Sequence, residues 1–155
     1  MLIPSPLLPG SCESLWLPFQ SSCYLVSFKR VSWHEAENSC NQLGAHLMVV
    51  NDEDEQVFIY MTNLLVDLWI GLVERGEEGN WTWVDGTNFN TTPHFWEKDQ
   101  PDNWHEVENG EDCGQLHHGM YWNDADCSAP FSYICEKEAD RQSNALDVFF
   151  SGSDS

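Results

Sequence analysis

Basic residues are scarce in this chain. Its 155 residues include six Lys and Arg against 26 Asp and Glu, which gives a formal net charge of −20. A surface this acidic repels the phosphate backbone of DNA and RNA, which excludes nucleic acid as a partner. Hard divalent cations bind carboxylate oxygens, so they suit a chain with this surplus of acids. Solubility alone would also account for the charge. The spacing of the acidic residues has to decide between cation binding and simple solubility.

Several patterns of catalysis and membrane insertion are also missing. No serine lies in a G-x-S-x-G turn, and no cysteines are spaced C-x-x-C, so a serine hydrolase, a zinc ribbon and a thioredoxin-type redox site are poor fits. We therefore do not expect an enzyme. No membrane span is visible. Residues 1–11 are apolar at the start, but they lack a positive charge and contain three prolines, which favours a remnant or stalk over a signal peptide.

Six cysteines are present, at positions 12, 23, 40, 113, 127 and 135. An even number at irregular spacings favours a disulfide framework, although six cysteines allow 15 pairings and spacing alone does not choose among them. Disulfides persist in oxidising compartments, so we expect an extracellular protein, either secreted or the ectodomain of a membrane receptor. Two N-x-S/T triplets, at Asn80 and Asn90, are candidate glycosylation sites that agree with this location.

Periodicity predicts an α+β domain. Residues 12–24 are typical of a short hairpin, and Ser32 with Glu35 forms a capping box for a helix that ends at Gly44. Asn51 is the expected cap of a second helix. The apolar residues expected on the buried face of that second helix are Val57, Phe58, Met61, Leu64 and Leu65. Short apolar runs at 68–72, 81–84, 120–122 and 131–135 predict strands.

A long segment, residues 85–112, separates two of these strands. It is rich in Asn, Asp, Gly and Pro, yet it also contains Phe89, Phe95, Trp96 and Trp104, too many aromatic residues for a disordered linker. Long ordered loops inside compact domains are usually functional. Residues 138–155 are polar and rich in serine, and we expect them to form a flexible tail.

Oxygen-bearing side chains gather in three clusters after residue 73. The first is Glu74 with Glu78, the second runs from Gln100 to Asn103 and continues at Glu111-Asp112, and the third is Asn123-Asp124. Carboxylates and side-chain amides supply the oxygen ligands that calcium requires, six to eight of them at roughly 2.3–2.6 Å. The clusters are far apart in the sequence, so a fold has to bring them together.

The order of these motifs resembles a known family, the C-type lectin domain. The motifs are Trp69-Ile70-Gly71-Leu72, Gln100-Pro101-Asp102, Glu111-Asp112-Cys113, Trp122-Asn123-Asp124 and the series of cysteines. The resemblance covers residues 12–137. It implies the double-loop fold, with two helices flanking short antiparallel sheets. The three disulfides that it implies are Cys12–Cys23, Cys40–Cys135 and Cys113–Cys127.

The resemblance also implies where calcium binds. The residues that match the sugar-binding calcium site are Gln100, Asp102, Glu111, Asn123 and Asp124. In that site two neighbouring sugar hydroxyls coordinate the ion, and the side chains that bind calcium also form hydrogen bonds with those hydroxyls. The Gln100–Pro101 peptide bond is expected to be cis. A weaker match to an accessory calcium site comprises Glu74, Glu78, Asn103 and Asp112.

The Gln-Pro-Asp order at residues 100–102 is typical of family members that bind galactose, whereas members that bind mannose have Glu-Pro-Asn. Trp104 matches the tryptophan that packs on the apolar face of galactose. The loop that follows, His105–Gly110, is shorter and more acidic than in galactose-binding relatives. Gln115 stands where some of them have a histidine that favours N-acetylgalactosamine. We therefore expect glycans ending in galactose or N-acetylgalactosamine as partners. A homo-oligomer is a possible assembly, in which several domains would bind at once and raise the affinity.

Two other interpretations need to be tested. A domain of this family can instead bind a protein or an ice surface, with calcium structural or absent. The pair His117-His118 suggests a transition-metal site, but it stands beside Gly119 with no H-E-x-x-H helix, so we expect it to be solvent-exposed.

Overall fold

The computed structural model describes residues 11–62, 64–76, 79–101 and 112–140. The helices are α1 (Trp33–Gln42) and α2 (Glu53–Met61), with a short 3-10 helix at Phe89–Thr91. The strands are β1 (Leu17–Phe19), β2 (Ser22–Val31), β3 (His46–Leu47), β4 (Leu68–Glu74), β5 (Trp81–Trp83), β6 (Asp112–His117), β7 (Tyr121–Asp126) and β8 (Phe131–Glu138). The α+β class is thus confirmed.

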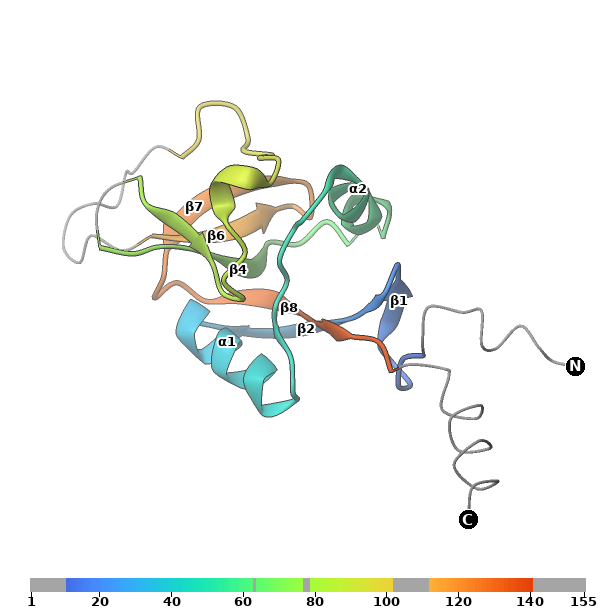
Figure 1. The fold of residues 1–155 in the computed structure, drawn as a ribbon. Helices are drawn as coiled ribbons and strands as arrows, with labels where there is room; N and C mark the ends of the chain where they lie inside the picture. Colours follow the sequence, from blue (N-terminus) through green and yellow to red (C-terminus); the bar gives the residue numbers. More distant parts are fainter. Residues whose placement is uncertain (1–10, 63, 77–78, 102–111, 141–155) are drawn as a thin grey trace, which may run out of the picture.

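One twisted sheet connects all the strands. Its order is β1-β2-β8-β4-β6-β7, with β3 added on β8 and β5 on β4. The β4–β8 pair is parallel and the other pairs are antiparallel. Helices α1 and α2 lie on opposite sides of the β2–β8 ribbon (Figure 1). Strand β6 was not predicted, because its acidic start was interpreted only as part of the ligand cluster.

The three disulfides have the expected pairing, which leaves no free cysteine. Cys12–Cys23 closes the N-terminal hairpin. Cys40–Cys135 joins α1 to β8 across 95 residues of sequence, and Cys113–Cys127 joins β6 to the residue after β7. The last of these connects the two strands that carry Asp112 and Asp124.

The start of α1 was predicted correctly. The buried face predicted for the second helix was correct only in part, since Phe58 and Leu64 pack against the core. Ser32 and Glu35 form the capping box of α1. Asp52, rather than Asn51, is the N-cap of α2, and its carboxylate accepts a hydrogen bond from the Glu55 amide. The buried side chains of α2 are Glu55, Gln56 and Ile59, whereas Val57, Met61 and Leu65 are largely exposed. Hydrogen bonds to buried polar groups decide which side of α2 packs inward, and an apolar pattern does not reveal them.

Strand β4 is buried along its whole length. At its centre, the backbone of Gly71 packs so closely that an added Cβ would lie 2.7 Å from the carbonyl oxygen of Leu47. The indole N–H of Trp33 donates to the Ile70 carbonyl at 2.8 Å, which fixes α1 against this strand. Gly71 is therefore required for close packing of β4 on the end of β3 and on Met48, which follows it.

Two carboxylic acids lie together in the interior between β2, α2 and β8. The hydroxyl of Tyr24 donates to Glu55 at 2.5 Å and lies 3.4 Å from Glu136. Glu136 also accepts from the Ser22 hydroxyl at 2.9 Å and from the Val49 amide at 3.0 Å. Burial, and then the charge of Glu55, raises the pKa of Glu136 to about 7. Burial likewise raises the pKa of Glu55.

This acid pair predicts a dependence of stability on pH. The pKa of Glu136 is about 7 in the folded state, whereas an unfolded glutamate titrates near about 4.3. Between these values the folded chain holds more protons than the unfolded chain. The free energy of unfolding therefore falls as pH rises through this window, by about 3 kcal/mol from this group. Glu136→Gln should flatten the fall, measured by urea unfolding in chelator at pH 5, 6, 7 and 8.

Glu138→Gln provides the matched control, since Glu138 lies two residues further along β8 and is exposed. It should keep the wild-type slope against pH. Only the slope is diagnostic, because the amide introduced by Glu136→Gln would also meet the hydroxyls of Ser22 and Tyr24 and could lower stability at every pH. Parallel curves for wild type and Glu136→Gln would contradict the raised pKa.

Candidate functional site

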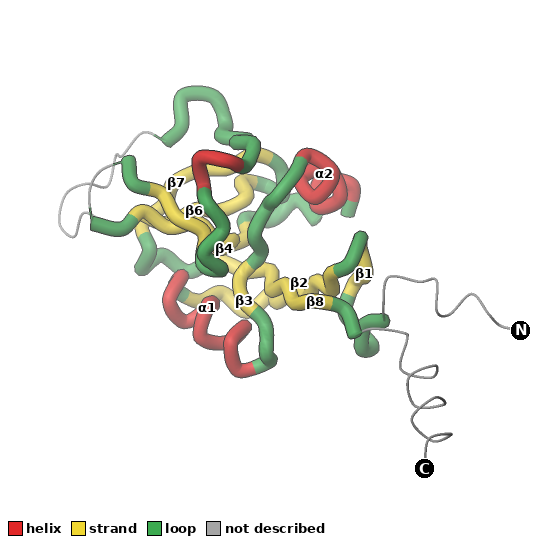
Figure 2. Tube along the Cα trace, viewed as in Figure 1, coloured by secondary structure: helices red, strands yellow, loops and turns green. Residues whose placement is uncertain are grey.

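The predicted site is built around a buried tryptophan, Trp122, near the start of β7. Its ring is edge-on to Trp83 at 5.4 Å, Trp96 at 5.5 Å and Phe95 at 5.7 Å between centroids. Phe89 lies within 6.5 Å. The aromatic residues in the described part of the long segment, residues 85–101, thus anchor that part to the sheet despite its polar composition. Figure 2 shows this segment as a loop above β6 and β7.

Backbone hydrogen bonds place Gln100 close to the same strand. Trp122 donates its amide to Phe95 at 2.9 Å, and its carbonyl accepts from Glu97 at 2.8 Å. The Gln100 amide then donates to the Glu97 carbonyl at 2.9 Å. The Gln100–Pro101 peptide bond is cis, as expected. The segment that ends in Gln-Pro therefore runs beside Trp122, the residue just before Asn123-Asp124.

Helix α2 supports Trp122 from another side through Gln56, a residue that the sequence did not single out. The indole N–H of Trp122 donates to the Gln56 side-chain oxygen at 2.9 Å. The amide nitrogen of Gln56 donates to the Met120 carbonyl. One buried glutamine thus connects α2 to the β6–β7 turn and to the start of β7. A polar residue in an apolar helix is ordinarily assigned to the exposed side, so no signal in the sequence pointed to it.

Carboxylates gather where β4, β6 and β7 meet. Asp112 lies directly opposite Asp126, and Gly114 lies opposite Asp124. Val73 pairs with Cys113, so the next residue, Glu74, faces Asp112 at the end of β4. Alternation along the strands puts Glu74, Asp112 and Asp124 on one face. All three are buried, with exposed fractions of 1–2%. Like charges placed opposite each other destabilise a sheet, and a bound cation would offset this cost.

The structure brings some predicted ligands together and does not describe others. Glu74, Asp112 and Asp124 share one face. Asn123 lies on the other face of β7, opposite Gln115. Asp126, which was not predicted, joins the acidic end, where it also accepts hydrogen bonds from the amide and hydroxyl of Ser128. The predicted residues outside the described part of the chain are Glu78, Asp102, Asn103, Trp104 and Glu111, together with the loop from His105 to Gly110.

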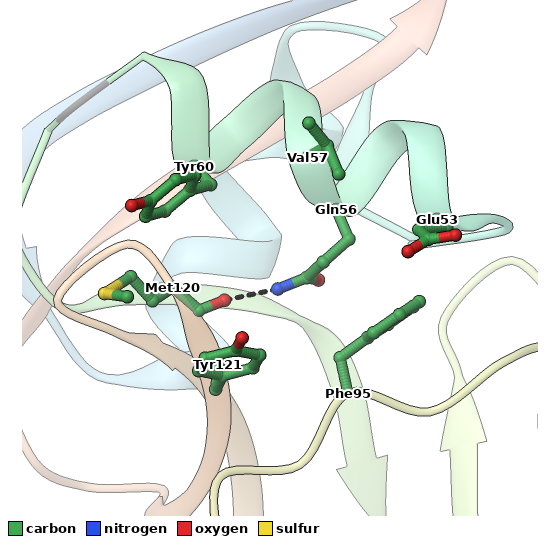
Figure 3. Close-up of a pocket in the computed structure, with 7 residues that line it drawn as sticks. All are labelled: Glu53, Gln56, Val57, Tyr60, Phe95, Met120 and Tyr121. Atoms are coloured by element: carbon green, nitrogen blue, oxygen red, sulfur yellow. Dashed lines mark hydrogen bonds between the residues drawn. The ribbon is translucent and has the colours of Figure 1, made fainter.

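A separate hollow of about 280 Å³ lies between α2, the β6–β7 turn and the long segment (Figure 3). Val57 and Tyr60 of α2 line it, opposite Phe95 and Tyr121. The hydrogen bond from Gln56 to Met120 forms its floor. No described residue of the predicted calcium sites lines this hollow, so it is distinct from them.

The remaining predicted surface features are accessible. Asn80 and Asn90 are both exposed, and the side-chain amide of Asn80 donates to the Arg75 carbonyl at 3.0 Å. His118 is exposed as expected, whereas His117 is half-buried. Gln115 is buried in β6. Over the described ranges, no helix has the length and apolar character needed to cross a membrane.

Comparison with known proteins agrees with this fold. Residues 29–137 match the family described as Lectin C-type domain. Over 128 residues the chain is 39% identical to asialoglycoprotein receptor 2 of Mus musculus, covering 81% of this chain and 42% of that protein. It is 40% identical over 127 residues to C-type lectin domain family 10 member A of Homo sapiens, covering 81% and 40%. The chain thus spans less than half the length of these relatives.

Solved structures have the same fold. The mouse scavenger receptor C-type lectin carbohydrate-recognition domain has a TM-score of 0.78 at 32% identity, covering 84% of this chain and 100% of that one. A trimeric structure of the Kupffer cell C-type lectin receptor Clec4f has a TM-score of 0.71 at 39% identity, covering 80% and 83%. A calcium-independent type II antifreeze protein has a TM-score of 0.72 at 26% identity, covering 84% and 96%. The chain belongs to the C-type lectin domain family.

Proposed function

We propose that this chain is the calcium-dependent carbohydrate-binding module of an extracellular protein and that it recognises terminal galactose or N-acetylgalactosamine. The observation that supports the proposal is the position of the Gln100 segment beside Trp122, the residue just before Asn123-Asp124. The Gln100 segment is held against the residue that precedes Asn123-Asp124, and buried Asp124 shares its face of the sheet with Asp112 and Glu74. Cytosolic location and catalysis are not needed to explain these features.

The donor set fits calcium. Gln100 and Asn123 offer amide oxygens and Asp124 offers a carboxylate, which are hard ligands with the chemistry that calcium prefers. Asp102 and Glu111 would complete the set. Bound calcium would supply two further coordination positions for neighbouring hydroxyls of a sugar. The amides of Gln100 and Asn123 would donate hydrogen bonds to those hydroxyls, and the carboxylates would accept hydrogen bonds from them.

The accessory site rests on fewer residues. Glu74 and Asp112 face each other where β4 and β6 meet, and Glu78 and Asn103 would add oxygen ligands. Glu74 also has a structural role, because its carboxylate accepts a hydrogen bond from the Gly79 amide. Calcium at this position would hold the turn after β4 against the start of β6, next to the primary site.

Galactose preference is proposed from the order Gln-Pro-Asp at 100–102. Among the relatives, the asialoglycoprotein receptors are named for glycoprotein ligands, which supports a glycan ligand for this chain as well. The antifreeze protein has the same fold without calcium, so fold alone does not separate sugar binding from ice or protein binding. The ligand residues make that distinction, and the proposal depends on them.

Competition measures the proposed preference directly. With an immobilised galactose-terminated glycoprotein and millimolar calcium, free galactose should displace the chain with a dissociation constant on the order of 1 mM, equivalent to about −4 kcal/mol. Two hydroxyls on an ion and one stacked ring make a small contact. Useful affinity would come from several domains acting together, as in a homo-oligomer. Equal displacement by mannose, or no binding at all in calcium, would contradict the proposal.

Trp104→Ala tests the stacking contact by itself. The change removes an apolar contact with galactose whose binding free energy we estimate at about 1 kcal/mol, so galactose affinity should fall roughly five-fold. Calcium affinity, measured by calorimetry, should stay within the error of wild type. Trp96→Ala is not a suitable control because Trp96 packs on Trp122. Unchanged galactose affinity would show that Trp104 anchors its loop and does not contact the sugar.

A further inference from the structure

A second cluster of metal-binding groups lies at the other end of the β6–β7 hairpin. Asp67 precedes β4, and His117 and His118 lie at the turn between β6 and β7. One potential ligand atom from each of these three side chains lies within 4.8 Å of the other two. Within the described ranges, this is the one group of three His, Cys, Asp or Glu side chains that meets this limit. The sequence had suggested only the histidine pair.

The turn brings two adjacent histidines to the same side. Neighbouring residues of a strand normally point to opposite faces. His118 instead has a φ of 54°, in the left-handed region, and the following Gly119 has 69°. The two imidazole rings consequently stack, with centroids 4.1 Å apart and planes 20° apart. This local reversal puts both rings on one side of the turn. A metal ion binds a ring nitrogen in the plane of its ring, so one imidazole has to rotate out of the stack for both to bind the same ion.

Asp67 is held in place for the same cluster. Its Oδ1 accepts the backbone amide of His118 at 2.8 Å, a contact between residues 51 apart in sequence. The same oxygen lies 3.3 Å from Nδ1 of His117. Tetrahedral zinc, with bonds of about 2.0–2.1 Å, needs its ligand atoms about 3.3 Å apart. Nδ1 of His117 is shielded from solvent and forms no hydrogen bond with any described residue.

We propose that Asp67, His117 and His118 form a binding site for a zinc-type transition-metal ion, separate from the calcium site. Two imidazoles and one carboxylate favour zinc, copper or nickel over calcium, which prefers oxygen ligands. A cleft of about 340 Å³ that Asp67, His118 and Arg30 line gives room for a water molecule at the fourth position. The cluster is about 17 Å along β6 from Asp112, so the two metal sites are independent.

Zinc itself is the probe. Isothermal titration of the oxidised full chain in saturating calcium should give one zinc site per chain, and cobalt in place of zinc should give the visible absorption of a tetrahedral centre. His118→Gln, which changes an exposed side chain, should weaken zinc binding by roughly tenfold or more. Asp67→Asn should do the same while its amide oxygen still accepts the His118 N–H. His34→Gln, at an exposed histidine on α1, is the control and should bind zinc as wild type does.

Thermal unfolding gives a second measurement. Zinc should raise the melting temperature of wild type and His34→Gln, and this rise should be absent in His118→Gln and Asp67→Asn. Equal zinc affinities in wild type, His118→Gln and Asp67→Asn would overturn the proposal, as would the absence of a zinc site in wild type. In those cases the cluster only stabilises the β6–β7 turn. Neither outcome bears on galactose binding.

Discussion

Removal of calcium should abolish binding to galactose-terminated glycoprotein and lower the melting temperature by roughly 5–10 °C. The sugar would lose the ion that coordinates its hydroxyls. The fold would lose the charge that offsets the acidic end of β4, β6 and β7. A ligand that is present at about a hundred times its dissociation constant adds about 2.7 kcal/mol to stability, which corresponds to a shift of this size in a domain of this length. Differential scanning calorimetry with calcium and with chelator measures the shift.

Two neighbouring carboxylates provide matched variants for this experiment. Asp124 is buried on the face shared with Asp112, so Asp124→Asn should remove most of the calcium-dependent shift and the sugar binding. Asp126 lies two residues further along β7 and is exposed, where it accepts hydrogen bonds from Ser128. Asparagine can accept the same bonds, and Asp126 is not a proposed ligand, so Asp126→Asn should keep sugar binding and most of the calcium-dependent shift, losing only the part that comes from its repulsion with Asp112. Sugar binding that persists in chelator would rule out the calcium-dependent mechanism.

Exchange of the two residues that flank Pro101 should reverse the sugar preference. Gln100→Glu combined with Asp102→Asn gains one acid and loses one, so net charge is unchanged and a general electrostatic effect cannot explain the result. The exchange reverses which side of the site donates and which accepts hydrogen bonds to the sugar hydroxyls. We expect galactose affinity to fall roughly tenfold or more and mannose to become the better competitor, a difference of about 1.4 kcal/mol for each factor of ten.

Calcium affinity separates a change of preference from damage to the site. The double variant should bind calcium within a few-fold of wild type, because both residues still offer oxygen ligands. Asp99→Asn is the matched control, since Asp99 is exposed and adjacent, and its φ of 69° is tolerated by asparagine. It should keep galactose preference. If the double variant binds calcium normally and still prefers galactose, residues other than Gln100 and Asp102 set the selectivity.

Local chemistry explains most of the correct structural predictions. The Ser32-Glu35 capping box depends on residues three apart, and β4 is recognisable as an apolar run because it is buried on both faces. The cysteine pairing followed from the family resemblance, not from spacing. The polar contacts of α2 were missed because they depend on residues far away in the sequence and not on local chemistry. Glu55 and Gln56 face inward only because Tyr24 and Trp122, far away in sequence, present partners for them.

By itself, the sequence determined the class of the domain, its capping and strand patterns, and an ordered motif set that identifies the family and nominates oxygen ligands for calcium. Each of these depends on residue type and order. Tertiary structure alone decided which acids share a face, because strand register sets Asp112 opposite Asp126 and Asp124 opposite Gly114. It also brought Asp67 to His117-His118 across 51 residues. Such contacts arise from sheet pairing and from a left-handed turn, and no spacing in the chain encodes the resulting distances.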